Sequence, residues 1–355
     1  MMNEHSSAVD DRPLLLSDYD YELPADLIAQ TPADRRDGSR LMVVDRQSGT
    51  FRHHAFPDIT TFLRPGDLLV INDTRVLPAR LHGRKPTGGN VELLLLRRLE
   101  PGLWEAMGKP GRRLRPGSAV RLLTREGDPS DSSVVIEHRR DGGLFAVRLP
   151  VEVEGQLDRF GEMPLPPYIH TRLSDPERYQ TVYSEKVGSA AAPTAGLHFT
   201  PELLAELDVR GVRIARVTLH VGLGTFLPVK VEDMRQHEMH AEWFHVPAGT
   251  RTAIQETKAR GGRVIAVGTT SCRTLESVAS SKDEGDLSGW TSLFITPGYR
   301  WKTVDALITN FHLPRSTLLL LVSAFAGRDL MLDAYREAIR QRYRFYSFGD
   351  ALLIT

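Results

Sequence analysis

The sequence contains very little cysteine: Cys272 is the only one in 355 residues. A lone thiol excludes an internal disulfide, and it excludes a zinc cluster that needs several thiolates from one chain. This usage is typical of a protein that works in a reducing compartment, and we expect a cytoplasmic location.

The chain also lacks net charge, because 45 Lys and Arg residues balance 45 Asp and Glu residues. Bulk charge therefore neither favours nor excludes nucleic acid, and an RNA site has to come from local clusters. The longest apolar run, Leu318–Val322 with a small-residue continuation to Ala326, is too short to cross a bilayer. Residues 1–13 are polar and have no apolar core typical of a signal peptide. We expect a disordered lead over residues 1–13 and no membrane partner.

The rest of the composition, 41% hydrophobic and 25% charged, is that of a globular protein long enough for two cores. Between residues 67 and 155, short strand-like segments alternate with turns rich in Gly and Pro, which favours a small antiparallel barrel. After that stretch, strands alternate with helices, which indicates an α/β layer. We therefore predict an α/β fold with a mixed, largely parallel sheet formed by residues 14–66 and 156–355, and an antiparallel β-barrel domain of residues 67–155 inserted into it.

A stretch of small residues, Lys186–Phe199 (KVGSAAAPTAGLHF), leads to a well-marked helix start. Thr200 is a suitable N-cap and Pro201 suits the first helical position. Such a loop lets a ligand approach the backbone closely, and free N–H groups at the helix start point toward it. The alternative is a surface loop that ends in a buried histidine. The candidate site residues of this stretch are Ala195, Gly196, His198 and Phe199.

Two later stretches also contain histidines. His220–Val229 (HVGLGTFLPV) lacks the third glycine of a dinucleotide fingerprint, and Pro228 blocks the helix that should receive a pyrophosphate, so a smaller ligand is favoured. His237–His245 (HEMHAEWFH) has an i, i+3 histidine spacing, whereas zinc proteases use i, i+4, so a metal site is a minor alternative. Glu238 and His240 could form an acid–base pair, and the alternative is that Glu238 is only solvated.

The stretch Gly268–Glu276 (GTTSCRTLE) follows an apolar strand and opens a helix. Thr269 and Thr270 are capable N-caps, and together with Arg273 they could hold a carboxylate or a phosphate. Cys272 at a helix start could have a lowered pKa. A spectator thiol is the alternative, because no partner histidine is identifiable.

The stretch Ile308–Thr317 (ITNFHLPRST) again passes from a strand through a loop to a helix. His312, Arg315 and Ser316 would face a ligand above that helix start, and the alternative is an ordinary cap by Ser316. Several clusters of basic residues favour a partner with a phosphate backbone, such as RNA. The alternative is that each cluster is only a solvated part of the protein surface. The clusters are Arg35/Arg36, Arg84/Lys85, Lys109/Arg112/Arg113/Arg115 and Arg340/Arg342/Arg344, the last interleaved with Tyr343, Phe345 and Tyr346.

Together these stretches resemble one family, the S-adenosylmethionine:tRNA ribosyltransferase-isomerases of the queuosine pathway. The resemblance covers the chain from Tyr19 to Ile354. The segments that carry it are YELPADLIAQTPADRRDGSRLMV (21–43), GDLLVINDTRVLPARL (66–81), GEMPLPPYI (161–169), AAPTAGLHFT (191–200), HVGLGTFLPV (220–229), EMHAEWF (238–244), VGTTSCRTLES (267–277) and ITNFHLPRSTLL (308–319).

The resemblance implies an enzyme that transfers and isomerises the ribosyl part of S-adenosylmethionine onto 7-aminomethyl-7-deazaguanine at the tRNA wobble position. The product is epoxyqueuosine-tRNA, and adenine and methionine leave. It implies tRNA and S-adenosylmethionine as partners, no metal and no cofactor, since S-adenosylmethionine is consumed as a substrate. The sequence is compatible with a monomer. Two other functions are retained as alternatives: an S-adenosylmethionine-dependent tRNA methyltransferase and a non-catalytic RNA-binding module.

Set against that chemistry, the candidate residues fall into three groups. Proton transfer needs a general base, and the candidates are His198, Glu238, His240 and His312. Substrate contacts are expected from Asp73, Arg75, Ala195, Gly196, Phe199, His220, Gly222, Gly224, Phe226, Trp243, Thr269, Thr270, Arg273, Arg315 and Ser316. Contacts to tRNA are expected from Lys109, Arg112, Arg113, Arg340 and Arg342.

Overall fold

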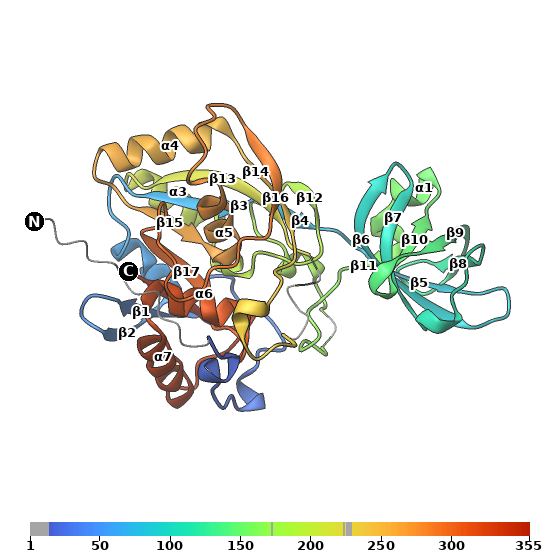
Figure 1. The fold of residues 1–355 in the computed structure, drawn as a ribbon, viewed down its shortest axis with the longest axis horizontal. Helices are drawn as coiled ribbons and strands as arrows, with labels where there is room; N and C mark the ends of the chain where they lie inside the picture. Colours follow the sequence, from blue (N-terminus) through green and yellow to red (C-terminus); the bar gives the residue numbers. More distant parts are fainter. Residues whose placement is uncertain (1–13, 172, 223, 225–228) are drawn as a thin grey trace, which may run out of the picture.

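The computed structural model describes residues 14–171, 173–222, 224 and 229–355. The predicted lead over residues 1–13 and the candidate Phe226 lie outside the described residues. Figure 1 shows a large α/β body and a smaller β-barrel joined by thin connections. Within the described ranges, no helix is both long enough and apolar enough to cross a membrane.

The centre of the large body is a mixed β-sheet. In the described part of the chain nine strands form it, in the order β16 (Leu287–Thr291), β14 (Glu242–Val246), β13 (Arg213–His220), β3 (Leu68–Asn72), β15 (Val264–Val267), β17 (Ala306–Asn310), β18 (Ala351–Ile354), β1 (Arg40–Asp45) and β2 (Thr50–Ala55). The neighbours β13, β3, β15 and β17 run parallel, whereas the outer pairs β16–β14, β14–β13, β17–β18 and β1–β2 are antiparallel. The predicted mixed sheet is confirmed.

Helices cover both faces of this sheet. On one face lie α4 (Ala248–Ala259), α5 (Gly268–Val278), α6 (Thr317–Ala326) and α7 (Arg328–Arg340), and on the other lie α3 (Pro201–Val209) and the 3₁₀ helix η3 (Phe56–Thr61). The strands alternate between the two cores: Met42 packs with the first layer and its neighbour Val43 with the second. This alternation is the period-2 pattern of a buried strand.

The smaller body is a closed antiparallel barrel. Six of the described strands close it, in the order β5 (Arg80–Arg84), β6 (Asn90–Glu100), β7 (Leu103–Lys109), β10 (Phe145–Arg148), β9 (Pro129–Arg139) and β8 (Ala119–Leu123), with β8 pairing back to β5. The short helices α1 (Val151–Glu154) and α2 (Leu157–Phe160) complete its apolar core. The strand β11 (Gly161–Glu162) then pairs with β5.

Strand membership corrects the predicted limits of the insertion. The segment 67–72, predicted for the barrel, contains β3, which lies in the middle of the large sheet. All five residues of β3 are buried, as expected of a parallel strand covered on both faces, and its apolar run alone could not distinguish the two locations. At the other end, residues 156–162 were expected in the α/β part, but α2 and β11 belong to the barrel.

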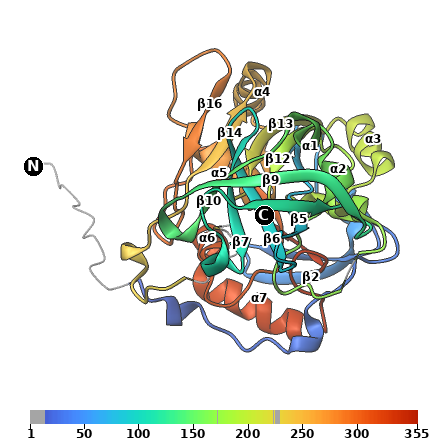
Figure 2. The same ribbon diagram turned by 90° about the vertical axis from the view of Figure 1, so that its right-hand side faces the viewer.

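Two linking strands connect the bodies. β4 (Thr74–Val76) leaves the carboxyl end of β3 and pairs in parallel with β12 (Lys186–Ser189). Entry and exit of the barrel touch, since a Cβ on Gly161 would lie 1.8 Å from the Pro78 carbonyl oxygen. The barrel therefore emerges from the edge of the sheet at which the parallel strands end, and Figure 2 shows the barrel in front of the large body.

Candidate functional site

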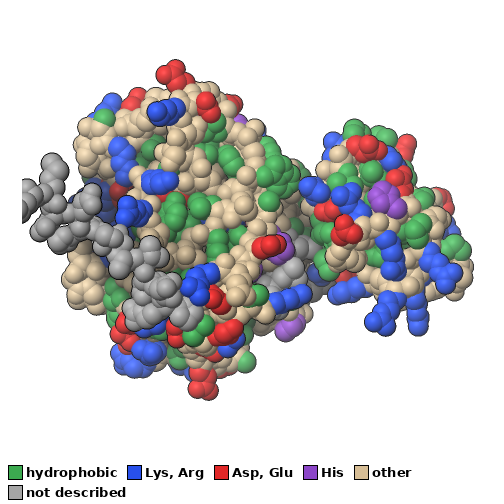
Figure 3. Space-filling model, viewed as in Figure 1, with side chains coloured by type: hydrophobic (Ala, Val, Ile, Leu, Met, Phe, Trp, Pro, Cys, Tyr) green, Lys and Arg blue, Asp and Glu red, His purple; other side chains and the backbone are tan. Residues whose placement is uncertain are grey.

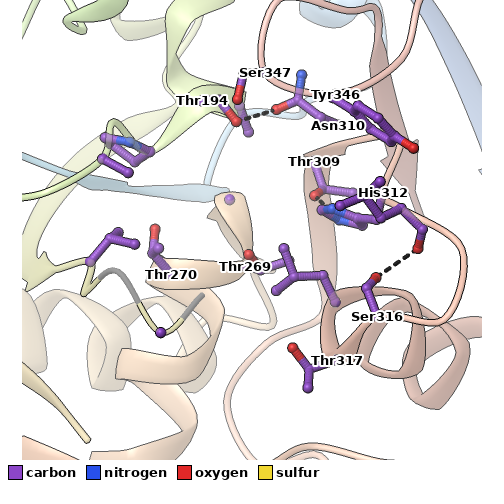
Figure 4. Close-up of a pocket in the computed structure, with 18 of the residues that line it drawn as sticks. Thr194, Thr269, Thr270, Thr309, Asn310, His312, Ser316, Thr317, Tyr346 and Ser347 are labelled. Atoms are coloured by element: carbon purple, nitrogen blue, oxygen red, sulfur yellow. Dashed lines mark hydrogen bonds between the residues drawn. The ribbon is translucent and has the colours of Figure 1, made fainter. Parts of the chain in front are cut away.

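A cavity of about 440 Å³ lies at the carboxyl ends of β15 and β17 (Figure 4). Loops at this edge of an α/β sheet are the usual place for a ligand. Its walls come from segments that are far apart in the sequence. They are Leu16, Tyr168, Tyr179, residues 191–195, the stretch from Val221 to Glu242 in part, residues 268–270, residues 309–318, and Tyr346 with Ser347.

Two helix starts form one side of the cavity. α5 begins at Gly268, so Thr269 and Thr270 lie in its first turn, not at the N-cap as predicted. α6 begins as predicted: the Ser316 hydroxyl oxygen accepts a hydrogen bond from the Leu319 N–H at 3.2 Å. Free N–H groups and the helix dipole at such ends favour an anionic group.

Asn310 connects the cavity to the buried His198. Its side-chain oxygen accepts a hydrogen bond from Thr194 at 3.0 Å, and its amide nitrogen lies 3.1 Å from His198 Nε2. Because the Asn310 amide is a donor, His198 Nε2 must accept from it. The ring proton is therefore on His198 Nδ1, which lies 2.8 Å from the Ser39 hydroxyl oxygen. Burial lowers the pKa of His198 to about 4, so the ring is neutral at pH 7. His198 is not part of the cavity wall.

His312 does line the cavity. Its ring Nε2 lies 2.9 Å from the Thr309 hydroxyl. Its backbone N–H donates to the Tyr335 hydroxyl at 2.9 Å, and its backbone carbonyl accepts from the Tyr21 hydroxyl. The Thr309 contact orients the ring and the two tyrosines hold the backbone, and Figure 4 shows His312 beside Thr309. Burial lowers the pKa of His312 to about 3, so it too is neutral at pH 7.

His240 lies on the exposed rim of the same cavity. The backbone of Gly224 packs against its ring, because a Cβ on Gly224 would lie 2.2 Å from His240 Cδ2. His237 also lines the cavity, and burial together with the nearby His240 lowers its pKa. Glu238, predicted as an acid–base partner, is exposed and is not among the lining residues.

Arg273 occupies a different place from the one its predicted role needs. It is buried behind the cavity, where it forms an ion pair with Glu242 and donates from Nε to the Leu293 carbonyl at 3.2 Å. Glu242 itself lines the cavity and also accepts from the Gly222 N–H at 2.9 Å. Nearby, burial raises the pKa of the Cys272 thiol, which contradicts the lowered pKa considered from sequence.

Four other candidates lie at the junction between the bodies, away from the cavity wall. Asp73 accepts from the Thr218 hydroxyl at 2.7 Å, and burial raises its pKa. Arg75 binds Ser184 at 2.9 Å and Glu177 at 2.6 Å. The other two, His220 and Trp243, stack with ring centroids 5.0 Å apart, and His220 Nδ1 lies 2.7 Å from the Thr74 hydroxyl.

The small-residue loop separates into a core part and a cavity part. Phe199 is fully buried against Phe56, with ring centroids 5.1 Å apart. Gly196 faces Tyr183, whose hydroxyl would lie 2.1 Å from an added Cβ. Ala195 lines the cavity. This loop therefore contributes the cavity wall through residues 191–195 and packs against the core beyond them.

Sequence reasoning missed the tyrosine side of the cavity. Tyr168 and Tyr346 have ring centroids 4.8 Å apart, and the Tyr168 hydroxyl lies 2.8 Å from the Ser347 hydroxyl. Tyr346 has φ 70° and Arg315 has φ 54°, which are costly values for residues other than glycine. The available signal was the aromatic run around Tyr346, but its basic neighbours suggested an RNA surface.

The predicted tRNA contacts differ in how much of their charge is free. Arg112 and Arg113 are exposed at the end of the barrel, in the 3₁₀ helix η4 (Gly111–Arg113), and Lys109 lies 4.0 Å from Glu92. Figure 3 shows Lys and Arg side chains gathered on the barrel. Two other candidates form ion pairs on the large body. They are Arg340, paired with Glu337, and Arg342, paired with Asp26.

Comparison with known proteins covers nearly the whole chain. A family model described as a queuosine biosynthesis protein matches residues 16–354. Proteins named S-adenosylmethionine:tRNA ribosyltransferase-isomerase are 57% identical over 344 residues in Symbiobacterium thermophilum (96% of this chain, 99% of that protein) and over 345 residues in Synechococcus elongatus (96% and 95%).

A solved structure gives the same result. The crystal structure of S-adenosylmethionine tRNA ribosyltransferase from Thermotoga maritima is 40% identical, with a TM-score of 0.56, over 95% of this chain and 100% of that one. These matches confirm the resemblance drawn from the sequence motifs, and they include the segments that line the cavity. The chain therefore belongs to the queuosine biosynthesis protein family.

Proposed function

We propose that this chain transfers and isomerises the ribosyl moiety of S-adenosylmethionine onto 7-aminomethyl-7-deazaguanine at the wobble position of tRNA. The products are epoxyqueuosine-tRNA, adenine and methionine, and the reaction belongs in the cytoplasm. The observation that carries the proposal is 57% identity, over 96% of this chain, to proteins named S-adenosylmethionine:tRNA ribosyltransferase-isomerase. No lining segment of the cavity falls outside the matched residues.

The sulfonium of the substrate acidifies its C5′ protons, and removal of one of them begins the loss of adenine. The amine of the modified base then attacks the ribose C1′, and closure of the epoxide expels methionine. We assign the proton transfer to His240, because it lines the cavity from the exposed rim. His312 and His198 are weak bases, with pKa values lowered to about 3 and about 4. We assign them to holding the wall in position.

The remaining walls suit the other parts of the substrate. The first turns of α5 and α6 offer N–H groups and hydroxyls to the methionine carboxylate, a role that sequence reasoning gave to Thr269 and Thr270 together with Arg273. Glu242, whose charge is paired with Arg273, contributes carboxylate oxygen to the cavity wall that would lie near the sulfonium. The rings of Tyr168 and Tyr346 form an apolar wall for adenine.

The test is to incubate the protein with S-adenosylmethionine and tRNA that carries the aminomethyl base. Adenine and methionine should appear in equal amounts, and tRNA with unmodified guanine at the wobble position should give neither. S-adenosylhomocysteine as the product would identify a methyltransferase. Binding of tRNA with no product under any condition would leave a binding module and overturn the proposal.

A further inference from the structure

The outer strands of the large sheet present aromatic rings on one face. Cross-strand neighbours in an antiparallel pair point to the same face. Here His220 is opposite Trp243, and Trp243 is opposite Trp290. The three residues therefore form a row across β13, β14 and β16.

The opposite face of the same strands is covered by α5. Glu242 on β14 pairs with Arg273 of α5, and Thr291 on β16 lies 2.6 Å from the hydroxyl of Ser277, also on α5. Because neighbouring residues of a strand alternate, Trp243 and Trp290 point away from this helix. Trp290 is 56% exposed, and no other aromatic residue stands among the exposed large apolar side chains of the described ranges.

The barrel brings a cation to this row. The guanidinium of Arg97, on β6, lies 5.6 Å from the centre of the Trp290 ring. Arg97 also lies 3.6 Å from Glu105, which holds it in place. Figure 3 shows further Lys and Arg side chains on the part of the barrel that faces the large body. Trp290 is thus open to solvent beside a cation, whereas Trp243 and His220 are partly buried and Gly188 packs against the His220 ring.

The row also begins next to the cavity. His220 is followed by Val221, and Trp243 is preceded by Glu242; Val221 and Glu242 both line the cavity. Glu242 points to the α5 face and the row to the opposite face, so a polymer with one unit in the cavity would reach the row by passing around this edge of the sheet.

We propose that Trp290 and its row form a stacking surface for unpaired nucleotides of the tRNA anticodon loop, next to the nucleotide that enters the cavity. The inference rests on the proposed function. Unpaired bases are bound by aromatic faces, and the phosphates between them are bound by arginine, which is the pair of groups found here. Arg97 therefore contacts the backbone of the stacked nucleotides.

The experiment measures binding and turnover separately. The probe is tRNA that carries the aminomethyl base at the wobble position, bound without S-adenosylmethionine. Trp290→Ala should weaken its binding about tenfold, while the KM for S-adenosylmethionine and kcat at saturating tRNA stay unchanged. Trp290→Phe, which keeps a ring, should stay within about twofold. Arg97→Ala should weaken binding less and should flatten its salt dependence.

The matched control is Val209→Ala, which removes an exposed apolar side chain from α3 and should change nothing. Tryptophan fluorescence gives a direct readout, since the tRNA-dependent quenching should be smaller in Trp290→Phe, with Trp243 of the same row still present. Unchanged tRNA binding by Trp290→Ala would overturn the inference. So would an equal rise in the KM for S-adenosylmethionine, or a change only in self-association, which would mark a protein contact.

The two proposals fail in different ways. If the wild-type protein releases no adenine but Trp290→Ala still weakens tRNA binding, the result supports the stacking surface and contradicts the proposed reaction. If adenine is released and Trp290→Ala binds tRNA as the wild type does, the result supports the reaction and contradicts the stacking surface.

Discussion

The barrel and the cavity end of the large sheet are built in opposite ways. The barrel buries an apolar interior, with residues such as Leu93, Val120 and Phe145, and all its strands come from residues 80–162. The cavity gathers segments between residues 168 and 347 together with Leu16, and buries polar groups such as Asn310 and His312. Buried polar groups are costly unless they are hydrogen-bonded. Chemistry therefore belongs to the cavity end, and the barrel contributes a compact charged body.

The largest expected effect is on turnover. His240→Ala should lower kcat by about 10²- to 10⁴-fold, because it removes the proposed proton carrier from the cavity rim. The control is His82→Ala, on the barrel strand β5, which should leave kcat unchanged. Single-turnover rates of adenine release would measure both variants. Equal losses of kcat in His240→Ala and His82→Ala would contradict the assignment of the chemistry to the cavity end.

The second effect is on stability in acid. Burial lowers the pKa of His198 to about 4 and that of His312 to about 3, whereas an unfolded chain titrates near 6.5. Their stability contribution is complete above pH 6.5. It is lost as the pH falls toward those lowered values, because only the unfolded chain takes up protons there. From pH 7 to pH 5 we expect a loss of about 4 kcal/mol in the free energy of unfolding for the pair.

Urea unfolding at both pH values measures this loss. His312→Gln should reduce the pH-dependent part by about half, whatever its stability at pH 7. The barrel offers the contrast, since His138 is exposed and His138→Gln should leave the pH dependence as it is. A pH dependence that is the same in His312→Gln as in the wild type would contradict the assignment.

A third effect compares two glycines of one loop. Gly224→Ala would place a Cβ 2.2 Å from the His240 ring, whereas an alanine at Gly222 would meet no atom within 4 Å. We expect kcat to fall about tenfold in Gly224→Ala, because a displaced catalytic group loses its alignment. Gly222→Ala should keep the wild-type rate. A loss of the same size in both would show that the loop itself, not His240, is sensitive.

The smallest expected effect is a change in tRNA affinity caused by substitutions on the barrel. Arg112→Ala combined with Arg113→Ala should weaken tRNA binding modestly. It should also reduce the slope of log affinity against log salt by about 1.5, since two phosphate contacts are removed. Arg340→Ala with Arg342→Ala should change that slope less, because these arginines already pair with Glu337 and Asp26. Binding titrations at several salt concentrations check both, and identical slopes would show that the barrel end does not meet the tRNA.

The sequence predicted those parts of the fold that depend on local signals. The barrel hairpins follow from Gly and Pro turns between short strands, and the start of α3 follows from Thr200, which accepts from the Leu203 N–H as an N-cap should. β3 was placed in the wrong body, because an apolar run of five residues does not identify its partners. Its location is decided by pairing with β13 and β15, which lie far away in the chain. Contacts over such distances leave no pattern in the local sequence.

The candidate site divides in the same way. The sequence singled out loops between strands and helices, and three of their residues, His312, Thr269 and Ser316, line the cavity. Arg273 does not, because Glu242, 31 positions away, holds its guanidinium in the interior. Tyr346 lines the cavity unexpectedly, since only the fold brings the end of the chain beside Phe311.

The point at which the barrel is inserted has a consequence for the order of folding. Asp73, just past β3, bonds to Thr218 of the neighbouring strand β13, 145 positions away. Closing a loop of that length costs chain entropy and slows folding. Within it, however, Arg80 pairs with Glu162, so a barrel that has already closed brings the two halves of the sheet together. The barrel also leaves the ribosome before β13, and we expect it to form first and to shorten the search by which the central sheet is completed.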